Sequence, residues 1–204
     1  MAKGGLRKLI LGLIVLGLAA RGPAGARAPR ELKIGFSPSE SISDIKRHAA
    51  PVVRALARQL DMEVVPFIAT DYTGLIEAMR AGKLDVAFLG PQAYILANKE
   101  AGARVLLKVK RNRSDHYYAA IITRTDSGIR NLKDLQDHTF AYTDAVSTTG
   151  YVYPRLMLSQ AGVANPDRFF RSVIFGGGHE QVVLAVLNKK VDAGAVYSND
   201  LQGK

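Results

Sequence analysis

Short apolar runs alternate with amphipathic segments of helical length along the chain after residue 30, and this alternation constrains the fold more than any other feature. Leu32–Phe36 and Val64–Ile68 have the length and the apolar content of β-strands. Between them, Ile45, Ala49 and Leu56 recur at helical spacing. Strands that alternate with helices favour parallel sheets joined by crossover helices. The chain is therefore predicted to be an α/β protein.

The alternation divides into two similar units that meet near residue 120, without a close sequence repeat. The predicted strands are Leu32–Phe36, Val64–Ile68, Asp85–Leu89, Val105–Val109, Tyr118–Thr123, Thr139–Tyr142, Val173–Phe175 and Ala193–Tyr197. We expect two α/β lobes with a cleft between them, lobe 1 over residues 29–118 and lobe 2 over residues 119–204. Ligands of such sheets bind outside the carboxyl ends of the strands, so the loops that follow strands are the candidate sites.

The net charge of +10 does not indicate a nucleic-acid-binding protein, because six of the 28 basic residues lie in residues 1–30, where there is no acidic residue. The remaining 22 basic residues against 18 acidic ones give an ordinary surface. The apolar stretch Leu9–Ala20 follows three basic residues and, at 12 residues, is shorter than the roughly 20 that span a bilayer. This pattern predicts a secretory signal peptide over residues 1–28; the alternative is an uncleaved membrane anchor.

The chain has no cysteine, which excludes disulfides and a lipid attached to a mature N-terminal cysteine. We therefore expect a periplasmic protein that is not a lipoprotein. The sequence has no Cys-His pair, no G-x-S-x-G elbow and no phosphate-binding P-loop. Its four histidines do not have the spacing of a zinc site. These absences predict a binding protein rather than an enzyme, without a metal or other cofactor.

Ser147-Thr148-Thr149-Gly150 stands directly before a predicted helix. Hydroxyl groups and free backbone N–H groups at the positive end of a helix dipole form a site for an oxyanion, and Gly150 lets a ligand approach the backbone. Ordinary helix capping is the alternative, although one hydroxyl would suffice for a cap. Gly176-Gly177-Gly178-His179-Glu180 also joins a strand to a helix, and His179 could donate a hydrogen bond to an anion. A flexible turn with a surface histidine is the alternative there.

Two tyrosines and two aspartates complete the candidate residues. Tyr72 begins a helix of the first lobe, and Tyr117 stands before the strand that crosses between the lobes, so either hydroxyl could reach the cleft. Packing on the edge of a sheet is the alternative for Tyr72. Asp85 and Asp192 each lie where a helix leads into a strand, and we expect both to have a structural role in the turn.

Together, these motifs resemble the phosphate/phosphite/phosphonate-binding proteins of ABC importers. The motifs of the first lobe are Asp71-Tyr72-Thr73-Gly74, Ala81-Gly82-Lys83-Leu84-Asp85-Val86-Ala87 and Gly90-Pro91. Those that follow are Tyr117-Tyr118, Ser147-Thr148-Thr149-Gly150, Gly178-His179-Glu180 and Lys190-Val191-Asp192. The resemblance covers residues 31–200. Its specific part is the serine/threonine loop with the downstream Gly-His-Glu.

The resemblance implies a two-lobed, periplasmic-binding-protein-like type II fold that closes by a hinge, with its C-terminal part missing from this chain. It implies that a small phosphorus oxyanion is bound by Tyr72, Tyr117, Ser147, Thr148, Thr149, Gly150 and His179, with Asn199 at the position expected after the last strand. The implied function is the solute-binding component of an ABC importer for phosphonate, phosphite or phosphate. Its partner would be a permease in the inner membrane, and no nucleic acid is involved. The alternative is the ligand-sensing domain of a signalling receptor with the same fold.

Overall fold

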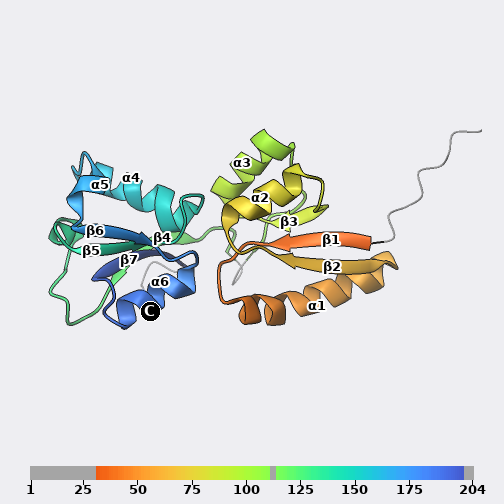
Figure 1. Cartoon of the computed structure of the whole chain (residues 1–204), viewed down its shortest axis with the longest axis horizontal. Coiled ribbons are helices and arrows are strands. Elements are labelled where there is room, and N and C mark those ends of the chain that lie inside the picture. Colours follow the sequence, from red (N-terminus) through yellow and green to blue (C-terminus); the bar gives the residue numbers. More distant parts are fainter. Residues whose placement is uncertain (1–30, 111–113, 200–204) are drawn as a thin grey trace, which may run out of the picture.

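A computed structural model describes residues 31–110 and 114–199, which form two α/β lobes side by side (Figure 1). The predicted two-lobed α/β architecture is confirmed. The predicted signal peptide, residues 1–28, lies outside the described residues. Among the helices of the described ranges, none combines the length and the apolar character that crossing a membrane requires.

The first lobe is built on a parallel sheet of three strands in the order β2-β1-β3. Its elements are β1 (Glu31–Phe36), α1 (Ile42–Leu60), β2 (Glu63–Ile68), α2 (Tyr72–Arg80), β3 (Val86–Phe88) and α3 (Pro91–Ala101). Helix α1 covers one face of the sheet, and α2 and α3 cover the other (Figure 1). Helix α2 packs on the sheet through the fully buried Leu75, whereas Tyr72 and Ile76 pack towards Ala93 and Ala97 of α3.

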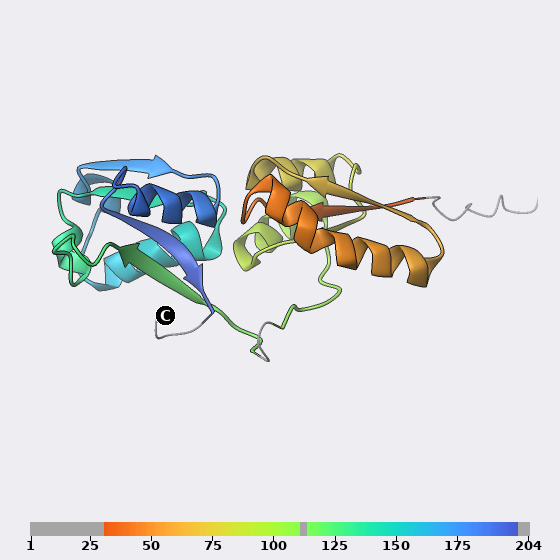
Figure 2. The same cartoon turned by 90° about the horizontal axis from the view of Figure 1, so that it is seen from below.

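The second lobe has a mixed sheet of four strands in the order β4-β7-β5-β6, in which only β4 is antiparallel to its neighbour. Its elements are β4 (Tyr118–Thr123), η1 (Leu132–Leu135), β5 (Thr139–Tyr142), η2 (Thr148–Val152), α4 (Tyr153–Gln160), α5 (Pro166–Phe169), β6 (Ser172–Phe175), α6 (His179–Leu187) and β7 (Ala193–Ser198). Strand β4, the first of this lobe, lies beside β7, the last (Figure 2). The aromatic core includes Phe140 and Phe170, whose rings stack 4.4 Å apart.

One predicted strand is wrong. Val105–Val109 forms no strand and has no regular secondary structure. Its apolar side chains are exposed, and Leu107 reaches 90% exposure. Apolar content alone does not make a strand, because a strand needs a neighbour for its N–H and C=O groups, and none within the described residues pairs with this segment.

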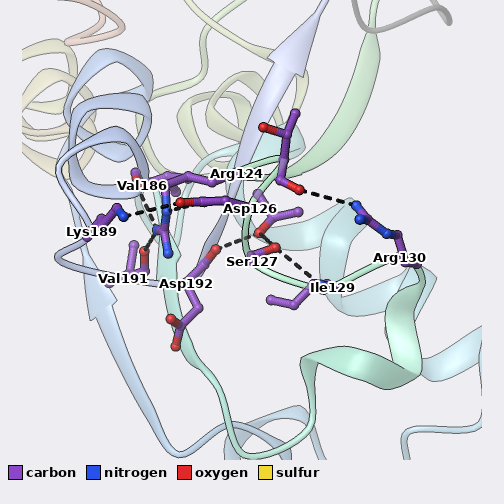
Figure 3. A network of polar contacts seen from close by, with 11 residues as sticks. Arg124, Asp126, Ser127, Ile129, Arg130, Val186, Lys189, Val191 and Asp192 are labelled. Carbon is purple, nitrogen blue, oxygen red and sulfur yellow. Dashed lines mark hydrogen bonds and ion pairs between the residues drawn. The ribbon is translucent and has the colours of Figure 1, made fainter.

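The end of α6 that lies away from the first lobe is fixed by a polar network around Arg124 (Figure 3). The Arg124 Nη1 atom donates to the carbonyls of Val186 and Val191, at 3.0 and 3.1 Å. The Nε atom of the same arginine contacts Asp126 at 3.2 Å. A guanidinium at the C-terminal end of a helix satisfies free carbonyls and complements the helix dipole. The same helix begins at His179.

Candidate functional site

The loop after β5 folds back on itself and begins a helix in the second lobe. Ser147 caps this helix, since its Oγ accepts the N–H of Gly150 at 3.0 Å. The chain then makes the short π-helical turn η2 and continues as α4. Ser147 and Thr149 are 3% and 5% exposed. Buried hydroxyls at the start of a helix, beside N–H groups that lack intrahelical acceptors, form a place for an anion.

Gly150 is required by packing, because its Cα lies against Thr143. A Cβ on Gly150 would lie 2.2 Å from the Oγ1 and 2.3 Å from the Cβ of Thr143. The N–H of Thr143 donates to the carbonyl of Gly150 at 3.1 Å, which holds the two backbones together. Thr143 has no exposed surface. The glycine therefore lets the loop fold closely over the end of β5.

His179 lies beneath this loop at the first position of α6, and it is only 7% exposed. Its Nδ1 is 3.2 Å from Thr143 Oγ1, and its Nε2 is 3.5 Å from Ser147 Oγ. The ring also packs edge-on against Tyr197 of β7, with centroids 5.0 Å apart. The loops after β5 and β6 therefore meet at one buried imidazole, although they are distant in sequence.

Tyr72 of the first lobe reaches the same place. It begins α2 and is 5% exposed. Burial raises the pKa of its hydroxyl above the ordinary value, the Asp144 carboxylate adds to the rise, and a hydrogen bond with Ser147 opposes it. Burial likewise raises the pKa of Asp144. Tyr72 and Ser147 thus bring one hydroxyl from each lobe together.

Thr148 and Tyr117 approach the start of α3. Thr148 Oγ1 accepts the N–H of Gln92 at 2.9 Å. Both Thr148 Oγ1 and the Tyr117 hydroxyl lie 3.8 Å from the position that a Cβ on Gly90 would take. Tyr117 is 38% exposed, so it stands at the rim of the group rather than in its interior.

A second pair of turns joins the lobes beside His179. The N–H of His179 donates to the carbonyl of Ser39 at 3.2 Å. The Glu180 carboxylate accepts the N–H of Ser41, the N-cap of α1, at 2.7 Å. Each lobe therefore supplies one backbone donor and one acceptor to the other.

Seven of the eight predicted ligand-binding residues gather where the lobes meet, and Tyr72 packs there against Ala93 and Ala97 of α3. Asn199 is the exception in position, because it is exposed and follows the end of β7. Sequence reasoning missed Thr143 and Tyr197. Thr143 directly follows β5, so the rule that ligands bind at the carboxyl ends of strands could have indicated it.

The residues that gather where the lobes meet offer hydroxyls, an imidazole and backbone N–H groups as hydrogen-bond donors. Such donors suit an anion held by charge-assisted hydrogen bonds. Across the described ranges, no cluster of three or more His, Cys, Asp or Glu side chains could hold a metal ion.

A family model described as the phosphonate periplasmic substrate-binding protein of ABC transporters matches residues 34–203. The phosphate-import protein PhnD of Mycolicibacterium smegmatis is 30% identical over 179 residues, which are 83% of this chain and 56% of that protein. The phosphonates-binding periplasmic protein of Escherichia coli is 32% identical over 177 residues, 84% of this chain and 52% of that protein. This chain therefore spans about half the length of these curated relatives.

Among solved structures, the binding-protein component of an ABC phosphonate transporter from Pseudomonas aeruginosa has a TM-score of 0.78 at 28% identity, over 82% of this chain and 57% of that one. This likeness confirms the predicted type II binding-protein fold. The tetrathionate sensor histidine kinase TtrS of Salmonella typhimurium is also similar, with 27% identity over 80% of this chain and 28% of the kinase.

Proposed function

This chain belongs to the family of periplasmic phosphonate-binding proteins of ABC transporters, and we propose that it is the solute-binding component of an importer for phosphonate, phosphite or phosphate. One observation carries the proposal. The buried Ser147 at a helix start and the buried His179 meet the Tyr72 hydroxyl, which comes from the other lobe. A phosphorus oxyanion has oxygens in several directions, and only a site with donors on several sides matches all of them.

In this proposal, the loop Ser147–Gly150 binds the oxyanion with its hydroxyls and N–H groups. His179, at the start of α6, binds another oxygen of the same anion. Tyr72 and Tyr117 contact the ligand from the first lobe. Asn199 is proposed to contact a larger substituent of the ligand at the rim of the binding site.

We propose that capture occurs by closure of lobe 1, residues 29–118, on lobe 2, residues 119–204, without chemical turnover. The protein is then not an enzyme, and it delivers its ligand to a permease in the inner membrane. The proposed location is the periplasm, after export by a signal peptide and without a lipid anchor.

Isothermal titration calorimetry of the purified protein tests the capture step with methylphosphonate, phosphite and phosphate, and with sulfate for comparison. We expect at least one of the three phosphorus anions to bind more tightly than sulfate. His179→Ala should abolish that binding, and His48→Ala is the matched control because His48 is exposed and pairs with Glu40 within the first lobe. A folded protein that binds none of the three would refute the proposal.

The likeness to a sensor kinase favours a second candidate, the sensing domain of a receptor. Capture of the anion is common to both functions, so uptake separates them. Disruption of the gene should abolish uptake of the labelled anion by an importer, whereas loss of a sensor would change gene expression and leave uptake intact.

A further inference from the structure

Thr143 determines where the proton of the buried His179 ring lies. A threonine hydroxyl has one hydrogen to donate. Thr143 Oγ1 lies 3.0 Å from the carbonyl oxygen of Ala195, and a carbonyl can only accept. Two oxygens at this distance need a hydrogen between them, and the hydroxyl is its only source in this pair. The hydrogen of Thr143 therefore points to Ala195.

The same hydroxyl can then only accept from His179. Nδ1 of the ring lies 3.2 Å from Thr143 Oγ1, so Nδ1 must carry a hydrogen and donate it. In a neutral imidazole the other nitrogen then has a lone pair. That nitrogen, Nε2, faces the Ser147 hydroxyl at 3.5 Å, on the side of the candidate oxyanion loop.

A neutral ring held in this form cannot donate from Nε2 to an anion. A fully ionised oxyanion would place a lone pair of its own against that of Nε2, and burial makes such an unmatched contact costly. One proton between Nε2 and the ligand oxygen removes the conflict. It can arrive on the ligand as a P–OH group or on the ring as an imidazolium.

We propose that Thr143 is a positioning residue that makes ligand capture proton-coupled, so that the site binds a phosphorus oxyanion together with one proton shared with His179 Nε2. This inference rests on the proposed function. The balance is simple: a dianion and a neutral histidine take one proton from solvent, whereas a monoanion with a P–OH group brings its own. No other bond forms or breaks.

The titratable groups around His179 come from several elements. Tyr197 of β7 packs on the ring, and Tyr72 of α2 reaches it through Ser147. Asp144 acts on Tyr72, and Glu180 of α6 directs its carboxylate to the N–H of Ser41. Burial raises the pKa of both Tyr72 and Asp144, so the tyrosine stays protonated over the pH range of the tests.

The first test needs no ligand. Long-range ¹H–¹⁵N correlation spectra distinguish the two neutral tautomers of histidine, and His179→Gln identifies the signal of His179 among the four histidines of the chain. At alkaline pH we expect the Nδ1–H form in the parent protein and in Thr143→Ser. In Thr143→Val, which lacks the acceptor, the Nε2–H form should gain population. An Nε2–H form in the parent, or an unchanged tautomer in Thr143→Val, would overturn the inference.

The second test counts protons. Calorimetry with methylphosphonate or phosphate, in buffers of different ionisation enthalpy above the second ionisation of the ligand, should show uptake of one proton. The dissociation constant should then rise about tenfold per pH unit. Thr143→Ser should keep this slope, and Thr143→Val should flatten it, because a neutral Nε2–H can donate directly. Tight binding by the parent without uptake contradicts proton coupling. Failure of every anion to bind refutes the proposed function instead, while the tautomer still reports on Thr143.

Discussion

Glu180 offers a test of lobe closure that does not touch the candidate anion site. Its carboxylate crosses from α6 to the N–H of Ser41 at 2.7 Å, and Ser41 begins α1 of the other lobe. Substitution of Glu180 by Ala removes this acceptor and leaves His179, the preceding residue, in place. If the contact holds the lobes together, the closed form should lose population.

The magnitude follows from the type of contact. A hydrogen bond to a charged group contributes about 1.5–3 kcal/mol net, and a carboxylate at a helix N-terminus about 0.3–1 kcal/mol. Glu180 is partly exposed, so the lower ends of both ranges apply, about 1.8 kcal/mol in total. This corresponds to a factor of about twenty in the closing equilibrium. The apparent affinity for an anion should weaken by up to the same factor, mainly through faster dissociation.

Distance measurement by pulsed electron paramagnetic resonance reports closure directly. The chain has no cysteine, so Lys46→Cys in α1 and Asn188→Cys after α6 accept spin labels at two exposed sites only. Glu180→Ala should shift the distribution to longer distances. Glu40→Ala is the matched control, because Glu40 adjoins Ser41 but its carboxylate binds His48 within the first lobe. Unchanged distances in Glu180→Ala, or an equal shift in Glu40→Ala, would refute the reasoning.

Three further substitutions test how single residues contribute to the stability of the fold. Gly150→Ala forces a Cβ to within 2.2 Å of Thr143 Oγ1 and should cost about 1–3 kcal/mol in urea unfolding. Arg124→Ala removes the donor to the carbonyls of Val186, in the last turn of α6, and of Val191, before β7, and should lower the melting temperature, with a cost of about 1–3 kcal/mol. For Asp192, burial raises the pKa but hydrogen bonds from Thr139 outweigh it, so the net pKa is lowered. Its stabilisation is present above the unfolded-state pKa and is lost as the pH falls, and Asp192→Asn should therefore flatten the acid limb of the stability profile.

Each of these substitutions has an internal check. Gly90→Ala meets its nearest neighbours at 3.8 Å and should be close to neutral, unlike Gly150→Ala. Lys189→Ala removes only an exposed ion pair of the Arg124 network and should cost less than about 1 kcal/mol. An unchanged acid limb in Asp192→Asn would contradict the role given to that carboxylate.

Features set by local sequence were predictable. Asp85 and Asp192 were expected to serve turns, and each carboxylate accepts the N–H of a residue in a neighbouring strand, Lys33 and Thr139, at 2.8 and 2.9 Å. The loop Ser147–Gly150 was predicted from its own hydroxyls and glycine. The loop and the positions of the two aspartates can be recognised from adjacent residues, although the partners of the aspartates lie 52 and 53 residues away in sequence. The strand at Val105–Val109 failed because its pairing depends on a distant partner.

The proton position on His179 shows the limit more clearly. The sequence indicated the histidine, yet its chemistry depends on Thr143, which lies 36 residues earlier, and on the carbonyl of Ala195, which lies on β7. The position of Thr143 after a strand could place it near the site, but nothing in its local pattern shows that its hydroxyl accepts from His179. Only the strand order β7-β5-β6 brings the hydroxyl, the carbonyl and the ring within hydrogen-bond distance. A motif can therefore name the residue that meets an anion, whereas the topology decides whether that residue donates or accepts a proton there.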